Sequence, residues 1–246
     1  MKRYRWQILL GVALILLSAI LYSIHYAIFR DAHHIYIYLL GDIAFIPIEV
    51  LLVTLIINGL LNQREKKTRL EKMNMVIGSF FSEVGTLLLT YFSDFDPELA
   101  AIRKHLIVTN NWSDEEFVNV SKRLRNYDYK VEIRKIDMEG LKGFLLSKRD
   151  FLLRLLETPA LLEHEIFTEL LRAAFHFSEE LERREKVTGL PDSDYGHLAV
   201  DVKRAYTLLV QQWLEYMKYL KDNYPYLFSL AMRTNPFDQT ASPFVK

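Results

Sequence analysis

The stretch IYIYLLGDIAFIPIEVLLVTLIINGLL, residues 35–61, is almost wholly apolar, yet it carries two acidic side chains, Asp42 and Glu49. A helix needs about 20 apolar residues to cross the ~30 Å hydrocarbon core of a bilayer. An ionised carboxylate near the bilayer centre costs about 2.5–3.5 kcal/mol even on the insertion scale. The stretch therefore predicts a transmembrane helix that has a polar partner or water beside its two acids.

A second apolar run, residues 7–29, precedes this stretch and is separated from it by the five residues RDAHH at 30–34. This run exceeds the roughly 7–15-residue core of a signal peptide, and no A-x-A-like cleavage site follows it. We therefore expect a retained first transmembrane helix. Residues 1–61 are predicted to form a two-helix hairpin in the lipid bilayer.

Basic residues are concentrated at the outer ends of the predicted hairpin, and only Arg30 lies in its connecting loop. The positive-inside rule then predicts a multi-pass protein of the cell membrane with both termini in the cytoplasm. The basic residues after the second run are expected to contact anionic lipid headgroups. They are Arg64, Lys66, Lys67 and Arg69.

Composition excludes several classes of function. The 246-residue chain has 31 Lys plus Arg and 31 Asp plus Glu, so its overall charge gives no reason to expect nucleic-acid binding. It has no cysteine, which excludes disulfides, thiolate metal sites and cysteine nucleophiles. Signatures of serine hydrolases, P-loops, dinucleotide-binding loops, zinc proteases and kinases do not occur. We therefore expect no enzyme activity, no cofactor and no nucleic-acid partner.

Residues 62–234 have the pattern of a cytoplasmic helical bundle, and residues 235–246 are expected to form a flexible tail. Ser113 and Glu116 form a capping box that predicts a helix to about residue 126. Alternation over residues 127–136 favours one short strand. Further helices are predicted over 141–157, 161–186, 197–221 and 224–232. The predicted fold class is thus an all-α membrane protein, a transmembrane hairpin followed by a helical bundle.

Residues 73–92 are mostly apolar, with Glu83 as their only charge. We interpret them as the buried helix of the cytoplasmic bundle. The alternative is a third membrane segment or a re-entrant segment. Asn74, Ser79 and Ser82 are polar groups that a helix facing lipid would have to satisfy.

The chemistry of the predicted hairpin centres on its two acids. Asp42 and Glu49 lie seven residues apart, so they share one helical face and are about 10.5 Å apart along the axis. In a homo-oligomer they would form two stacked carboxylate rings, as in many cation pores. The alternative is a satisfied interhelical network, in which His25 or Arg30 pairs with Asp42. Pro47 lies between the acids and predicts a kink, since it cannot donate a hydrogen bond to the carbonyl four residues earlier.

The segment GDIAFIPIE, residues 41–49, thus places an acidic motif early in the second predicted membrane helix. With its short outer loop and inward termini, the hairpin resembles the pore module of the mitochondrial calcium uniporter and its prokaryotic relatives. That family shows a W-D-x-x-E-P pattern at this place. Here the tryptophan is missing and the acid spacing is seven rather than three. The resemblance covers about 30 residues of the hairpin.

Metal binding in the soluble part is not expected. His164, Glu165, Glu169 and His176 are close in sequence, but Arg172 lies between the last two and is a natural partner of Glu169. The paired E-x-x-H motifs of di-iron bundles are absent. The adjacent histidines at 33 and 34 are expected to be a solvated turn.

Three functional hypotheses follow. The first is a homo-oligomeric membrane protein, a cation channel whose pore is lined by Asp42 and Glu49, with a cytoplasmic domain for assembly or gating. Its partners would be the bilayer, copies of itself and inorganic cations. The second is a membrane-anchored helical scaffold or sensor that binds a protein partner. The third is an accessory subunit of another membrane complex.

Overall fold

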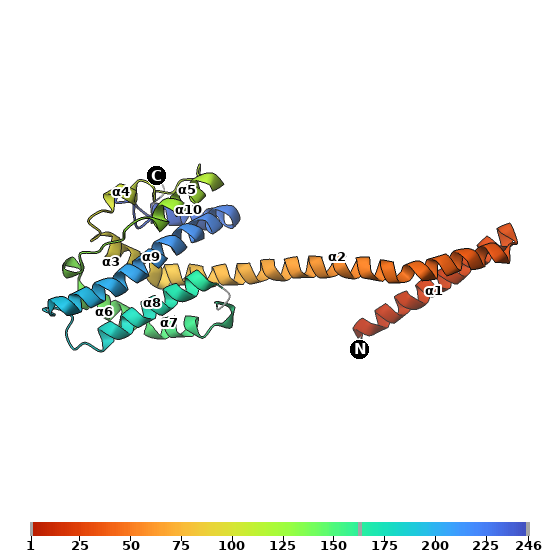
Figure 1. Ribbon diagram of the computed structural model, residues 1–246, viewed down its shortest axis with the longest axis horizontal. Coiled ribbons are helices and arrows are strands. Elements are labelled where there is room, and N and C mark those ends of the chain that lie inside the picture. The colour runs from red at the N-terminus through yellow and green to blue at the C-terminus, as the bar shows by residue number, and fades with distance from the viewer. Residues whose placement is uncertain (1, 162–163, 245–246) are drawn as a thin grey trace. The chain divides into compact units, whose positions relative to one another are not determined.

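The computed structural model describes residues 2–161 and 164–244, and within these residues it contains helices and no β-strand (Figure 1). The all-helical class is therefore confirmed for this part of the chain. The α-helices are α1 Lys2–Phe29, α2 Ala32–Phe80, α3 Thr86–Ser93, α4 Ala100–Arg103, α5 Asp114–Arg125, α6 Met138–Ser147, α7 Arg149–Leu156, α8 Glu165–Glu182, α9 Asp192–Asn223 and α10 Pro225–Arg233. A π-helical turn, Phe81–Gly85, joins α2 to α3, and short 3₁₀ turns occupy Ile133–Lys135 and Pro159–Leu161.

The chain divides into two compact units, Met1–Lys66 and Lys67–Lys246. The first unit is a helical hairpin made of α1 and the first part of α2. Figure 1 shows these two helices meeting at their connection and diverging from it. The second unit holds the remaining helices and the hydrophobic core.

The connection in the hairpin is shorter than predicted, two residues instead of five. Arg30 has a positive φ of 50°, the left-handed conformation that commonly ends a helix. The Asp31 carboxylate then accepts a hydrogen bond from the backbone N–H of His34, at 3.2 Å. This is the N-cap interaction that satisfies a free donor at a helix start. Because Asp31 caps the helix, α2 begins at Ala32 rather than at Ile35.

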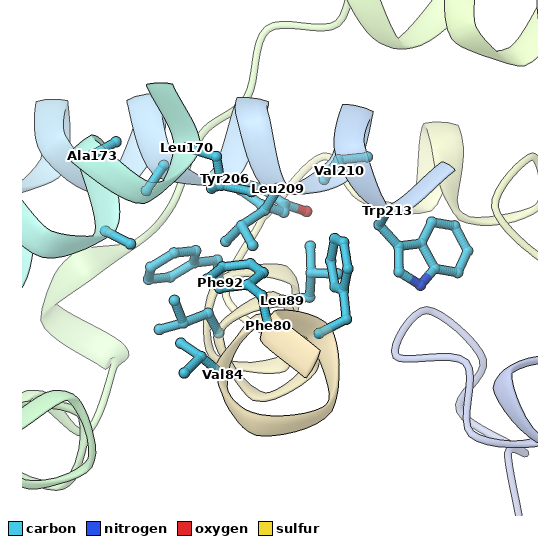
Figure 2. Packing of buried hydrophobic residues seen from close by; sticks show 14 of the residues in the cluster. Phe80, Val84, Leu89, Phe92, Leu170, Ala173, Tyr206, Leu209, Val210 and Trp213 are labelled. Carbon is cyan, nitrogen blue, oxygen red and sulfur yellow. The ribbon is translucent and has the colours of Figure 1, made fainter. Parts of the chain in front are cut away.

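The core of the second unit is built around residues 73–92, as the bundle interpretation predicts. Side chains from the end of α2, the π-helical turn and α3 point toward α8 and α9 (Figure 2). Phe80, Val84 and Phe92 are fully buried. The ring of Phe92 contacts Phe177 of α8 at 6.3 Å and Tyr206 of α9 at 6.0 Å, both edge-to-face. This apolar segment is thus covered by protein.

Most predicted helices are present, with changed boundaries. The capping box is confirmed, since the Ser113 hydroxyl accepts from the backbone N–H of Glu116, whose side chain accepts from the backbone N–H of Ser113. The helix predicted over 141–157 is two helices, because the backbone of Lys148 leaves helical geometry between them. The helix predicted over 161–186 begins at Glu165, and residues 162–163 lie outside the described part of the chain.

The short strand predicted over residues 127–136 is wrong. The segment is extended and then forms a 3₁₀ turn, Ile133–Lys135, and the described residues offer it no neighbouring strand. Apolar and charged residues alternate in this segment because every second side chain is buried or partly buried. Tyr129 is 1% exposed and contacts Tyr206 of α9, with ring centroids 5.0 Å apart. The backbone N–H of Glu132 donates to the carbonyl of Phe95 at 2.9 Å.

The segment predicted as a flexible tail, 235–246, begins inside the packed unit. The Asn235 side chain is buried and donates to the carbonyl of Leu106 at 2.8 Å. Phe237 is fully buried and its ring packs edge-on against Trp213, with centroids 4.9 Å apart. These contacts hold the start of the segment to the bundle, while residues 245–246 lie outside the described part.

The buried position of Phe92 gives a stability prediction. Phe92→Ala removes a fully buried ring between α8 and α9, and such substitutions cost about 3–5 kcal/mol. Denaturant unfolding of the full chain, followed by circular dichroism, measures the loss. Leu87→Ala is the matched control on α3, because Leu87 is 43% exposed, and it should change the free energy of unfolding by less than about 0.5 kcal/mol. Equal effects of the two substitutions would contradict the packing described here.

Candidate functional site

The candidate site lies on the hairpin, whose two helices are unusually apolar. Each contains an 18-residue window with a mean hydropathy of 2.3, and none of either window is buried in the chain. By length and composition, both helices are suited to cross a membrane. The segment Trp6–Phe29 belongs to α1, and the second window belongs to the helix that starts at Ala32.

Asp42 and Glu49 are both exposed on α2. Within the described residues, neither carboxylate has a hydrogen bond or an ion pair. Their seven-residue separation places them on one face of the helix, two turns apart. The hairpin therefore presents two carboxylates on an apolar surface without offering them a partner.

The two residues expected as partners of Asp42 lie elsewhere. The imidazole of His25 contacts Phe29, with centroids 4.8 Å apart, and stacks on His34 at 5.8 Å. Its Nε2 atom is enclosed and has no hydrogen-bond partner among the described residues. Arg30 is exposed and forms the left-handed end of α1. Neither residue forms a hydrogen bond or an ion pair with Asp42.

Pro47 lies inside α2, which continues through it as one helix from Ala32 to Phe80. Because proline has no backbone N–H, the carbonyl of Ile43 lacks its usual helical donor. That carbonyl is adjacent in sequence to Asp42, so one extra acceptor lies at the level of the first acid. An acceptor-rich level of this kind suits a proton, a water molecule or a cation.

The basic residues that follow the apolar run are exposed on α2. They are Arg64, Lys66, Lys67 and Arg69. They lie at the end of the first unit and the start of the second, where the sequence changes from apolar to charged.

The predicted pairing of Arg172 with Glu169 is confirmed, with Nη1 and Oε1 2.6 Å apart. His164 caps α8, since its Nδ1 accepts from the backbone N–H of Phe167 at 3.1 Å. Among the described residues, no three histidine or carboxylate side chains form a ready-made metal-ligand set. His176 faces α9 and lies near acidic residues there.

The side chains that face His176 were not predicted from the sequence. The available signal was spacing: H-x-x-x-E at 176–180 and H-x-x-x-D at 197–201 each put a histidine and an acid on one helix face. Only the packing of α8 on α9 shows that the two pairs meet.

Comparison with known proteins identifies the family. Residues 69–233 match the model "Uncharacterized protein MJ1433, C-terminal helical domain", and residues 2–61 match "MJ1433, N-terminal helical domain". The protein MJ1433 of Methanocaldococcus jannaschii is 50% identical over 238 residues, which cover 97% of this chain and 96% of that protein. The chain belongs to the MJ1433 family. No solved structure matches it.

The two domains of the MJ1433 family correspond to the two units of the structure. The N-terminal helical domain covers the hairpin with Asp42 and Glu49, and the C-terminal helical domain covers the bundle. The interval between the matches, residues 62–68, contains the division between Lys66 and Lys67. Both descriptions concern helical structure, so the function has to be argued from the residues themselves.

Proposed function

We propose that this MJ1433-family protein is a homo-oligomeric protein of the cell membrane in which the α2 helices of several copies enclose a hydrated path for cations. The observation that carries this proposal is the pair of carboxylates, Asp42 and Glu49, exposed on an apolar helix without a partner in the described chain. Both termini and the bundle lie in the cytoplasm, where the bundle holds the subunits together or gates the path.

The exposed apolar surface supports a membrane location. Ile15 of α1 is 71% exposed and Leu40 of α2 is 70% exposed, and the same holds along both apolar runs. Contiguous apolar surface of this extent marks a contact with lipid or with another protein. The glycines of the hairpin also have open space beside them. An added Cβ atom at Gly11, Gly41 or Gly59 would meet no atom within 4 Å. Neighbouring helices therefore have room to approach there, as small residues allow in membrane bundles.

The acids support association around α2. An ionised carboxylate in the hydrocarbon layer requires water or a partner, and the hairpin supplies no hydrogen bond or ion pair to either one within the described residues. Several α2 helices that turn this face inward would create a shared polar interior. The two acids would then form rings about 10.5 Å apart, and rings of Asp or Glu attract cations in many channels.

The same heptad spacing continues beyond the acids. Positions 42, 49, 56 and 63 are Asp, Glu, Ile and Gln, so the inward face would carry one apolar ring, at Ile56, between polar rings. Apolar constrictions can gate a pore by excluding water. The exposed cations Lys66 and Lys67 follow near the cytoplasmic end, where they would contact anionic headgroups.

The first prediction concerns the assembly. Native mass spectrometry of the full chain in nanodiscs should give one closed assembly of four or more copies, since fewer helices cannot surround a hydrated path. A monomer or a dimer would contradict the proposal. That result would favour a membrane-anchored scaffold or sensor, or an accessory subunit of another complex.

The second prediction uses the absence of native cysteine. Glu49→Cys introduces a single thiol on the inward face, so mild oxidation should cross-link neighbouring copies into dimers on a non-reducing gel. Leu51→Cys is the matched control, because two residues along a helix place it about 200° away. Cross-linking that is as efficient at residue 51 as at residue 49 would show that this face does not line a common interior.

The third prediction concerns ion flux. Proteoliposomes with the wild-type chain should take up Na⁺, K⁺ or Ca²⁺, and the double variant Asp42→Asn, Glu49→Gln should lose at least about 10-fold of that flux, because uncharged rings no longer attract cations. Glu115→Gln, an exposed acid of α5, is the control and should leave flux unchanged. Absence of flux in the wild type, or equal flux in the double variant, would overturn the proposed conduction.

A further inference from the structure

In the second unit, a histidine–acid pair on α8 lies next to a histidine–acid pair on α9. His176 and Glu180 are four residues apart on α8, and His197 and Asp201 are four residues apart on α9. The Nε2 atoms of His176 and His197 lie 3.7 Å and 3.6 Å from the same Asp201 oxygen, Oδ2. The Glu180 carboxylate bridges the other side, with Oε1 3.9 Å from His176 Nε2 and Oε2 3.6 Å from His197 Nε2. Four donor groups thus converge from two helices.

Asp201 is the unusual member of this cluster. Its side chain is only 4% exposed, and Oδ2 has no hydrogen-bond partner. The other oxygen, Oδ1, accepts a hydrogen bond of 3.3 Å from Arg204. A buried carboxylate oxygen without a partner is costly. This oxygen points at both imidazoles, so it lies where a cation held by the four groups would compensate its burial.

We propose that His176, Glu180, His197 and Asp201 bind a divalent transition-metal ion of the Zn²⁺ class. This site is separate from the proposed conduction path, because it uses only residues of α8 and α9. Imidazole nitrogen and carboxylate oxygen are both ligands of Zn²⁺, and the first-row ions that imidazole suits include Zn²⁺, Ni²⁺ and Cu²⁺. Cysteine, the softer alternative, is absent from the chain.

The separations suit a small ion. Bonds of about 2.0–2.1 Å in a tetrahedral site place neighbouring ligand atoms about 3.4 Å apart, and the four imidazole–carboxylate separations in the structure are 3.6–3.9 Å. As they are placed in the structure, no three or more histidine, aspartate or glutamate side chains among the described residues could hold a metal ion. Binding therefore requires the four donors to move inward. Both histidine side chains, 45% and 53% exposed, have the freedom to make this adjustment.

The surrounding charges also suit a cation. Arg184 donates to Glu180 at 2.7 Å and to Asp194 at 2.7 Å and 3.0 Å. The hydrogen bond from Arg184 fixes the position of the Glu180 carboxylate. The carboxylates of Glu180, Asp194 and Asp201 outnumber the two guanidiniums beside them, those of Arg184 and Arg204. Outer partners of this kind also fix the orientation of metal ligands.

The ion would join α8 to α9 next to the turn that connects them. That connection contains Gly189, whose φ of 68° is the left-handed conformation suited to glycine. Because the ligands come from both helices, the bound ion would stabilise this helical pair, and its affinity would appear as added resistance to unfolding.

Co²⁺ is the probe that tests this site, because its visible absorption reports tetrahedral coordination. The full chain, purified in detergent without an affinity tag, should bind one Co²⁺ with a tetrahedral spectrum that Zn²⁺ abolishes. His176→Gln and His197→Gln should each weaken binding at least about 10-fold, since even loss of an outer partner typically costs 10–100-fold. His105→Gln changes a partly buried histidine outside the cluster and should leave binding unchanged.

Two further measurements separate this site from alternatives. Zn²⁺ should raise the melting temperature of the wild type but not that of His176→Gln, whose helical content is checked by circular dichroism. The variant His33→Gln, His34→Gln removes the other histidine pair and should bind Co²⁺ as the wild type does. Absence of tetrahedral Co²⁺ at millimolar concentration, or binding that survives both cluster substitutions, would overturn the proposal and leave the cluster as a set of ion pairs.

Discussion

The covering of apolar surface is the constraint on which the rest of this structure depends. Before Lys66, the apolar side chains of α1 and α2 are exposed, as at Ile15 and Leu40. After Lys72, the side chains of Met73, Ile77 and Phe80 on the same helix α2 are buried, and Ile77 and Phe80 are fully enclosed. One continuous helix thus has its apolar residues covered by protein in the second unit, whereas in the first unit the chain leaves them uncovered. An apolar surface of this extent marks a contact with lipid or with another protein.

Local signals in the sequence were sufficient for most of the fold. The capping box at Ser113 and the run that ends before Pro159 act within a few residues, so their structural effect is readable without knowledge of the rest of the chain. The apolar composition of residues 73–92, interrupted by polar side chains, correctly indicated a core segment of the bundle. The alternation of apolar and polar residues gave a wrong prediction where a helix distant in sequence determined which side chains are buried. Tyr129 alternates with polar neighbours because α9 covers it, and α9 is not a strand.

The same limit applies to the sites. Asp42 and Glu49 were recognisable because a charge in an apolar run is anomalous by itself. The α8–α9 cluster was not, since His176 and Asp201 belong to ordinary amphipathic helices and become notable only when packing brings Asp201 Oδ2 within 3.7 Å of His176. Likewise, nothing near Asn235 in sequence indicates that its side chain donates to the carbonyl of Leu106. Contacts between distant segments are the information that local reasoning lacks.

The two acidic clusters share one physical problem, a carboxylate oxygen without a partner among the described residues. In the bundle, the unpartnered oxygen of Asp201 lies 3.6–3.7 Å from two imidazoles, and the same imidazoles lie near Glu180 on two packed helices. Such fixed, convergent donors favour a resident ion. On the hairpin, Asp42 and Glu49 have no convergent donors among the described residues. Carboxylates that project from separate copies into shared water would bind cations more weakly, and weak binding at successive sites is what conduction requires.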